Sequence, residues 1–210
     1  MADSSLSDTV AFITGAGSGL GAAFARRLAA DGARVIVNDM NADAASATAI
    51  DIGGETAIFD VCDSTSFDAE VDKAVERHGR LDIMINNAGI APVITDTRFE
   101  AGLANQMLRM EGRISEMQPS DYLVGLSDDE WDRMIRVHLY GAFFGTRAAL
   151  RHMQPARRGS IVNISSVLGQ QPSAGAAHYA AAKAGVIALT KSTAQEVAHL
   201  GIRANAVCPG

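Results

Sequence analysis

The chain has 210 residues, of which 48% are hydrophobic and 20% are charged, and its formal net charge is −6 at pH 7. The acidic balance and the lack of a basic stripe argue against nucleic acid as a partner. No apolar run of about eighteen residues is present to span a membrane. The polar N-terminus lacks a secretory signal, and the two cysteines, Cys62 and Cys208, lie far apart. We therefore expect a cytoplasmic protein without disulfides, and no metal site.

Short apolar runs alternate with longer helical stretches along the chain. The strand-like runs are Thr9–Thr14, Arg34–Asn38, Thr56–Phe59, Leu81–Asn86, Ser160–Ile164 and Arg203–Val207. The helical stretches are Leu20–Ala30, Ala42–Ile50, Ser66–His78, Asp128–His152 and Tyr179–Ala198. This alternation predicts an α/β fold, a doubly wound, Rossmann-like parallel sheet with helices on both faces. No linker or repeat interrupts it, so residues 1–210 are predicted to form a single domain.

The turn after the first strand is rich in glycine and reads TGAGSGLG at residues 14–21. Because position 20 is leucine, the spacing is G-x-x-x-G-x-G, carried by Gly15, Gly19 and Gly21. Glycine lets backbone amides approach a pyrophosphate, and the N-terminus of the following helix favours its charge. A turn of this kind between a first strand and a helix predicts a dinucleotide-binding loop.

The second strand ends in VIVNDM, which places a carboxylate at Asp39. A carboxylate at this point accepts hydrogen bonds from both adenosine ribose hydroxyls and repels a 2′-phosphate. Neither position 18 nor position 40 carries an arginine or lysine to offset the repulsion. We therefore predict NAD rather than NADP as the cofactor. The alternative is an aspartate that merely serves the turn.

A polar-rich segment of about residues 95–125 separates the fourth strand from the next helix, whose start carries the capping box SDDE at 127–130. Apolar residues within the segment recur at helical spacing, at Phe99, Leu103, Met107, Met110, Ile114 and Met117. This spacing predicts an inserted amphipathic helix. It leaves the ligand-binding edge of the sheet, so it either caps the substrate pocket or packs as an accessory helix.

Tyr179 and Lys183 stand four residues apart in HYAAAKAG, so they share one face of the last predicted helix. A phenol and an ammonium beside three alanines are costly unless both have partners. The pair alone is a weak signal, since a rim tyrosine and a solvated lysine give the same spacing. The other motifs have to decide between these readings.

Taken together and in this order, the motifs resemble those of the short-chain dehydrogenase/reductase family. The matching segments are TGAGSGLG (14–21), the acidic residue 39, DV (60–61), NNAG (86–89), NISS (163–166), YAAAK (179–183) and PG (209–210). The resemblance covers most of the chain. It implies a doubly wound catalytic domain and NAD(P)-dependent oxidation of alcohols or reduction of carbonyls.

The resemblance also implies roles for individual residues. Ser166, which lies the family's usual thirteen residues before the tyrosine, would hydrogen-bond the substrate oxygen, whereas Ser165 does not match. Tyr179 would move the proton, and Lys183 would favour the phenolate and reach the nicotinamide ribose. The implied cofactor-binding residues are Gly15, Ser18, Gly19, Leu20, Gly21, Asp39, Asp60, Val61, Asn87, Ala88, Gly89, Tyr179, Lys183, Pro209 and Gly210.

The chain departs from the family at His138, where a V-N-x-x-G context usually supplies asparagine as a fourth catalytic residue. Helical spacing directs His138 toward the sheet. A neutral histidine can donate one hydrogen bond and accept one, so it can hold the water that the asparagine holds. With an ordinary pKa near 6.5 it can also titrate. We include His138 in the catalytic set. The alternative is a core histidine that fills space.

The predicted activity is hydride transfer between NAD and a small apolar secondary alcohol or ketone. The alternatives are a 3-oxoacyl thioester (carbonyl) reductase and a catalytically impaired dinucleotide-binding sensor or scaffold. The family usually assembles through its two long helices, which implies a homo-oligomer, a tetramer before a dimer. The family's substrate-loop region would follow PG, where these residues end, so we expect that region to be missing and the substrate is left open.

Overall fold

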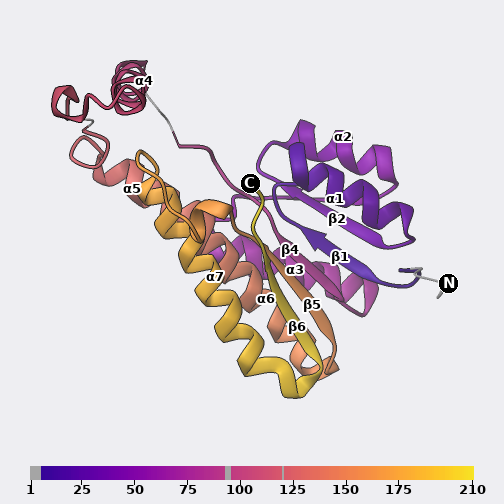
Figure 1. Ribbon diagram of the computed structural model, residues 1–210. Helices are drawn as coiled ribbons and strands as arrows, with labels where there is room; N and C mark the ends of the chain where they lie inside the picture. Colours follow the sequence, from indigo (N-terminus) through magenta and orange to yellow (C-terminus); the bar gives the residue numbers. More distant parts are fainter. Residues whose placement is uncertain (1–5, 93–95, 120) are drawn as a thin grey trace.

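The computed structural model describes residues 6–92, 96–119 and 121–210 and shows one parallel sheet flanked by helices (Figure 1). The strands pair in the order β3-β2-β1-β4-β5-β6, and every neighbouring pair is parallel. They are β1 (Val10–Ile13), β2 (Arg34–Asp39), β3 (Glu55–Ile58), β4 (Ile83–Asn86), β5 (Gly159–Ile164) and β6 (Ile202–Val207). All six lie within two residues of their predicted bounds, so the doubly wound α/β fold is confirmed.

The order in which the chain adds strands reverses between β1 and β4. The chain first moves outward from β1 to β2 and β3, and then returns to β4 on the other side of β1. Loops that leave the carboxyl ends of two strands at such a switch point diverge, and the crevice between them binds ligands. The glycine-rich turn follows β1 and the NNAG segment includes the end of β4. Both motifs therefore lie at this crevice.

Among the described residues, seven α-helices connect the strands. They are α1 (Gly19–Ala30), α2 (Ala42–Ile52), α3 (Ser64–His78), α4 (Asp96–Met110), α5 (Asp128–Ile135), α6 (Gly141–Ala156) and α7 (Ala177–Val197). Short 3-10 turns occupy Ile114–Glu116, Val167–Gly169 and Ala198–Leu200. The single helix predicted over Asp128–His152 is divided by a π-helical turn at Arg136–Tyr140 and continues to Ala156.

Each face of the sheet has its own hydrophobic core, because successive residues of a strand point to opposite faces. Phe12 is fully buried on the face covered by α3, α6 and α7, where its ring centroid lies 6.2 Å from that of Phe59 and 6.3 Å from that of Phe67. Its neighbour Ile13 is buried on the face covered by α1 and α2. The two groups of helices lie on opposite sides of the sheet in Figure 1.

Side chains fix the beginnings of several helices. The predicted capping box at α5 is confirmed, since the Ser127 hydroxyl accepts from the backbone N–H of Glu130 and the Glu130 carboxylate accepts from that of Ser127. Asp63 caps α3 by accepting from the backbone N–H groups of Thr65 and Ser66. Such caps satisfy amides that have no partner within the helix.

Helix α4 stands apart from the sheet, at the upper left of Figure 1. The helix predicted here is present, but it ends at Met110, and Gly112 follows with a φ of +74°. Leu103 is 49% exposed and Met107 is 57% exposed, so the apolar stripe faces solvent; the side chain of Phe99 lies outside the described part. None of the described α4 side chains lines the cavity described below, which favours the accessory helix over the cap of the two predicted alternatives. Across the described residues, no helix is both long and apolar enough to cross a membrane.

Candidate active site

A cavity of about 1190 Å³ opens above the carboxyl ends of the strands. Typical small-molecule pockets measure about 300–1,000 Å³, so this one has room for an extended ligand. The predicted site residues that line it are Gly15, Ser18, Gly19, Leu20, Asp39, Asp60, Val61, Asn87, Ala88, Gly89, His138, Ser166, Tyr179, Lys183, Pro209 and Gly210. The exception among the predicted residues is Gly21.

The glycine-rich turn needs its glycines for two different reasons. Gly15 has a φ of +61°, and a Cβ placed on it would lie 2.7 Å from the Cα of Ala88. Its bare backbone therefore forms a wall of the cavity. Gly21 does not line the cavity, and a Cβ there would lie 2.2 Å from the carbonyl oxygen of Gly15. Gly21 thus lets α1 pack against the turn, and its contact with a cofactor stays a prediction.

Asp39 lies at the rim of the cavity and also holds the glycine-rich turn in place. Its Oδ2 accepts from the backbone N–H of Gly17 at 3.1 Å, and its Oδ1 accepts from that of Asn41 at 3.0 Å. A Cβ on Gly17 would lie 2.8 Å from Asp39 Oδ2, so the position requires glycine. Each carboxylate oxygen has two lone pairs, so acceptor capacity remains for a ligand.

The NNAG segment is joined to the glycine-rich turn by hydrogen bonds. Thr14 Oγ1 accepts from the backbone N–H groups of Asn87 and Ala88, at 3.0 Å and 3.1 Å. Asn87 Nδ2 donates to the carbonyl oxygens of Thr14 and Gly15, at 3.0 Å and 3.1 Å. Asn87 therefore fixes the shape of the crevice between β1 and β4.

The loop after β3 forms the far wall of the cavity. Asp60 Oδ1 accepts from the backbone N–H of Cys62 at 2.9 Å, and Val61 packs beneath Gly141 of α6. Burial, together with the hydrogen bond to Asp60, raises the pKa of the Cys62 thiol to about 11. The thiol is therefore protonated at neutral pH, which makes Cys62 a wall residue and no nucleophile.

Ser165 and Ser166 both line the cavity but are bonded differently. Ser165 Oγ donates to the carbonyl oxygen of Lys183 at 2.8 Å. Ser166 Oγ accepts from the backbone N–H of Leu168 at 3.2 Å, so no described bond uses its hydroxyl proton. Of the two, Ser166 has the hydroxyl that can donate to a bound oxygen.

The lysine of the YAAAK segment is buried, which excludes the reading of a solvated side chain. Lys183 is 4% exposed, and its Nζ donates to the carbonyl oxygen of Ile164 at 2.7 Å. Burial lowers the pKa of Lys183 from 10.5 to about 8. Its Nζ lies 5.6 Å from the ring centroid of Tyr179, so the two side chains meet at the cavity as predicted from their spacing.

His138 extends toward Tyr179 and Lys183 from the π-helical turn. Such turns are often found at functional sites. The Nε2 of His138 lies 3.1 Å from the backbone nitrogen and 2.9 Å from the carbonyl oxygen of Ile90, and its ring meets that of Tyr179 edge-on at 5.2 Å. A Cβ on Gly89 would lie 2.5 Å from His138 Cε1, so this glycine makes room for the ring. Burial, followed by the charge of Lys183, lowers the pKa of His138 to about 4. The expected titration near neutrality is therefore wrong.

Comparison with known proteins agrees with this geometry. A family model described as short chain dehydrogenase matches residues 9–113 and 114–210. The chain belongs to the short chain dehydrogenase family. A 3-oxoacyl-[acyl-carrier-protein] reductase of Thermotoga maritima is 37% identical over an alignment of 210 positions, which covers 98% of this chain and 74% of that protein. A cis-4-hydroxycyclohexanecarboxylate dehydrogenase of Sinomonas cyclohexanicum is 39% identical over 207 residues, covering 97% and 73%.

A solved structure of the same fold was also found. The structure titled ribose-5-phosphate isomerase from Brucella melitensis has a TM-score of 0.81 at 34% identity, and the match covers 100% of this chain and 70% of that one. Members of the short chain dehydrogenase family use nicotinamide dinucleotides and act on hydroxyl or keto groups. This chain is therefore an oxidoreductase of that family.

Some residues of this short chain dehydrogenase site were missed by the sequence analysis. Ser165 was set aside as a mismatch and Ile90 was not considered, because their roles come from tertiary contacts with Lys183 and His138, which no local pattern reveals. A charged helix face also lines the cavity, through Asp129, Asp132 and Arg133 of α5 and Arg136 of the π-helical turn. These four positions share one helix face, so an assignment of helix faces would have found them.

Proposed function

We propose that this protein transfers a hydride between NAD and a small apolar secondary alcohol or ketone. The observation that carries the proposal is the convergence of Ser166, Tyr179, Lys183 and His138 on one cavity that also contains the glycine-rich turn. An impaired sensor or scaffold is less consistent with this arrangement, because it has no need for a buried lysine beside a tyrosine.

The residues present fit a nicotinamide dinucleotide. At Gly15 and Gly89 any side chain would clash with the opposite wall, which leaves bare backbone along the cavity. Asp39 is placed to accept from the adenosine ribose hydroxyls, and its charge disfavours a 2′-phosphate, which supports NAD over NADP. Asp60 and Val61 would border the adenine, and Lys183 would reach the nicotinamide ribose.

The chain's own residues would divide the chemistry as follows. When bound, the nicotinamide would supply the hydride-transfer chemistry. Ser166 would donate a hydrogen bond from its free hydroxyl to the substrate oxygen and so hold the reacting carbon in position. Tyr179 transfers the proton to or from the same oxygen, and the Lys183 ammonium favours the phenolate form. His138 would be neutral at pH 7 and would orient the site, because its Nε2 bonds Ile90 while its ring packs edge-on against Tyr179.

The lining residues that follow Gly89 and Ser166 in sequence are apolar, among them Ile90, Pro92, Val167 and Leu168, whereas the side of the cavity formed by α5 is charged. These apolar residues support an apolar alcohol or ketone as the substrate. A second candidate is a 3-oxoacyl thioester, which the 37% identity to a 3-oxoacyl-[acyl-carrier-protein] reductase favours. Asp39 argues against this second candidate, because such reductions usually draw on NADPH and the Asp39 carboxylate disfavours a 2′-phosphate.

The test is to mix the protein with NAD and a panel of secondary alcohols and to follow NADH absorbance. Turnover with NAD and its loss in Tyr179→Phe, with NAD binding retained, would support the proposal, because that change removes only the phenolic hydroxyl. A parallel assay with 3-oxoacyl thioesters and NADPH tests the second candidate. Faster turnover there than with NAD and alcohols would overturn the first.

We also propose a homo-oligomer, a tetramer before a dimer, in the cytoplasm. The exposed aromatic residues Trp131, Tyr140 and Phe143 on α5, the π-helical turn and α6 support a helix-mediated contact, since they leave apolar area in water. The free thiols of Cys62 and Cys208 suit a reducing compartment. A monomeric mass by light scattering at micromolar concentration would refute the oligomer.

A further inference from the structure

Two hydrogen-bonded links join the end of β5 to α7 just below the cavity. The upper link runs from Ser165 Oγ to the carbonyl oxygen of Lys183, at 2.8 Å. The lower link runs from Asn163 Nδ2 to Thr190 Oγ1 at 2.9 Å, and Thr190 Oγ1 in turn donates to the carbonyl oxygen of Val186 at 2.7 Å. Lys183 and Thr190 are two helical turns apart on the same face of α7, so the links fasten the helix at two levels.

The lower link continues beneath the other catalytic elements. Asn163 Oδ1 accepts from Asn86 Nδ2 of β4 at 2.8 Å, and Asn86 Nδ2 also lies 3.4 Å from Thr146 Oγ1 of α6. The side chains thus connect α6, β4, β5 and α7. These elements carry, or adjoin in sequence, the four proposed catalytic residues and the NNAG segment.

All of these polar side chains are buried. Asn163 is fully buried, Ser165 is 2% exposed, and Thr190 is 3% exposed. Burying a polar group costs free energy unless it is hydrogen-bonded, so apolar residues would hold a helix on a sheet more simply. What hydrogen bonds add is a defined geometry, because they fix donor and acceptor positions where apolar contacts allow sliding.

We propose that Asn163, Thr190 and Ser165 are positioning residues, which set the height and rotation of α7 so that Lys183 stands beside Tyr179 and the nicotinamide ribose. The proposal rests on the proposed function. On this proposal, the two links determine where the Lys183 ammonium lies. Among the described residues, the ammonium itself donates a hydrogen bond to the Ile164 carbonyl and to no other group. A shift of α7 along its axis would move Lys183 and Tyr179 together away from Ser166, which β5 holds in place.

The test compares Thr190→Val with Thr193→Val. Both threonines are buried in α7 and both changes replace a hydroxyl by a methyl group, but the described contacts include no side-chain hydrogen bond of Thr193. NAD and ADP affinities are measured by titration, because ADP lacks the nicotinamide ribose that Lys183 would contact. For Thr190→Val we expect NAD to bind about 5-fold more weakly with ADP unchanged, as for one lost hydrogen bond, and kcat to fall with KM for the alcohol nearly constant. Thr190→Ser, which restores the hydroxyl, should recover both.

Two results would overturn the proposal. One is a Thr190→Val variant that matches Thr193→Val in NAD affinity and kcat. The other is an equal loss of NAD and ADP affinity, which would indicate general loosening. If Thr190→Val does not fold, Ser165→Ala takes its place with the same expected loss of NAD affinity alone, and unchanged NAD affinity then refutes the proposal. Failure of the proposed function shows separately, as an unmodified protein that neither turns over alcohols with NAD nor binds NAD more tightly than ADP.

Discussion

At the scale of single residues, the site depends on two basic side chains whose pKa values are lowered by burial. Lys183 and His138 are both about 4% exposed, and neither has a carboxylate partner among the described residues. Their charged forms are therefore destabilised in the folded state. The spacing of YAAAK was enough to predict that Tyr179 and Lys183 meet. It could not show that Lys183 is buried against a strand carbonyl, because that contact is tertiary.

The first prediction concerns the stability cost of the lysine. Its pKa is about 8 in the folded state and 10.5 when unperturbed, so between these values the unfolded chain binds the extra proton and stability rises with pH. Lys183→Met removes this dependence and the buried charge. We expect it to raise the free energy of unfolding at pH 7 by up to about 3 kcal/mol, with the difference from the unmodified protein shrinking as the pH rises from 8 to 10.5. Chemical denaturation across this range checks it, and an unchanged difference would contradict it.

The second prediction concerns His138. Its pKa falls from 6.5 to about 4 on folding, so the unfolded chain binds the extra proton between these values and stability falls as the pH drops from 6.5 to 4. His138→Asn should lose less stability over that range than the unmodified protein does. It should also keep much of the activity, because an amide can either donate to or accept from Ile90 in place of the one hydrogen bond that Nε2 makes, whereas His138→Ala should lose most. Equal turnover in the alanine variant from pH 6 to 10 would leave His138 without a part in catalysis.

The third prediction is that Asp39→Ala weakens NAD binding and narrows the preference for NAD over NADP. The loss of the carboxylate removes a ribose acceptor and the repulsion of a 2′-phosphate. The structure adds a second effect, because Gly17 loses its hydrogen-bond acceptor and the turn that would hold the pyrophosphate is less restrained. Titration with NAD, NADP and ADP separates the two effects. Faster turnover with NADPH than with NADH in the unmodified protein would contradict the assignment.

At the scale of elements, the sequence predicted which strands and helices are present better than it predicted where a helix is interrupted. Apolar runs bounded by turns were enough for all six strands, and the helix around Tyr179 and Lys183 lies within two residues of its predicted bounds. The division of Asp128–His152 by the π-helical turn was not predictable. It coincides with the buried ring of His138, whose partner Ile90 lies in the segment after β4, far from the helix in sequence.

For helix α4, the sequence predicted the element but not its contacts. Its apolar spacing predicted the helix, but spacing alone cannot say what an apolar stripe contacts, and here Leu103, Met107 and Met110 are exposed. The fourth prediction follows from this. Replacing residues 97–118 by a short linker should leave folding and NAD binding intact, because neither described core contains a residue of α4. Thermal unfolding and NAD titration check it. A loss of folding would show that the segment supports the domain.

At the scale of the whole molecule, the fold was predictable because strand, turn and helix signals all agreed on the same β-α-β order. The contacts that shape the site were less predictable. They depend on contacts between residues far apart in sequence, such as Thr14 with Asn87 and Ser165 with Lys183. The family's sequence motifs supplied most of the predicted positions that line the cavity. Only tertiary contacts distinguish Gly21, which lets α1 pack against the turn, from Gly15, which lines the cavity.

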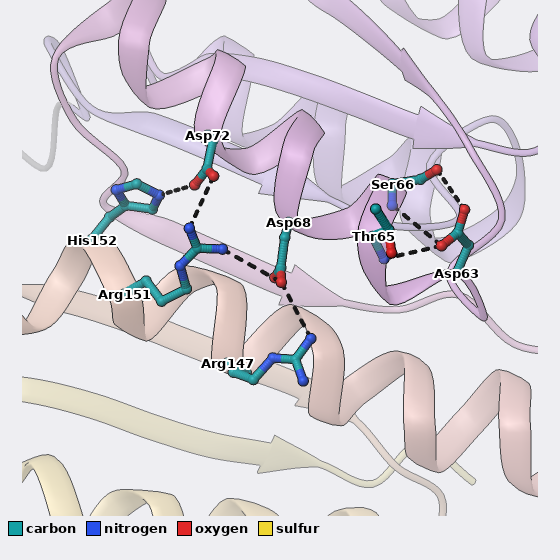
Figure 2. Close-up of polar contacts among 8 residues, drawn as sticks. All are labelled: Asp63, Thr65, Ser66, Asp68, Asp72, Arg147, Arg151 and His152. Atoms are coloured by element: carbon teal, nitrogen blue, oxygen red, sulfur yellow. Dashed lines mark hydrogen bonds and ion pairs between the residues drawn. The ribbon is translucent and has the colours of Figure 1, made fainter.

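The last prediction compares a buried core residue with a surface network. Figure 2 shows ion pairs between α3 and α6, in which Asp72 contacts Arg151 at 3.0 Å and His152 at 2.6 Å. The Asp72 side chain is 34% exposed and that of Arg151 is 47% exposed, so water and salt screen these contacts. Phe12, by contrast, is fully buried against the same helices.

Phe12→Ala should therefore lower the free energy of unfolding by about 3–5 kcal/mol, because it leaves a cavity in the larger core. Asp72→Asn should lower it by less than about 1 kcal/mol. Against a total of about 5–15 kcal/mol for a typical domain, only the first change threatens the fold. Urea denaturation of both variants at low and high salt checks the comparison. If the asparagine variant lost as much stability as the alanine variant, the ion pairs between α3 and α6, and not the core around Phe12, would hold that face of the sheet together.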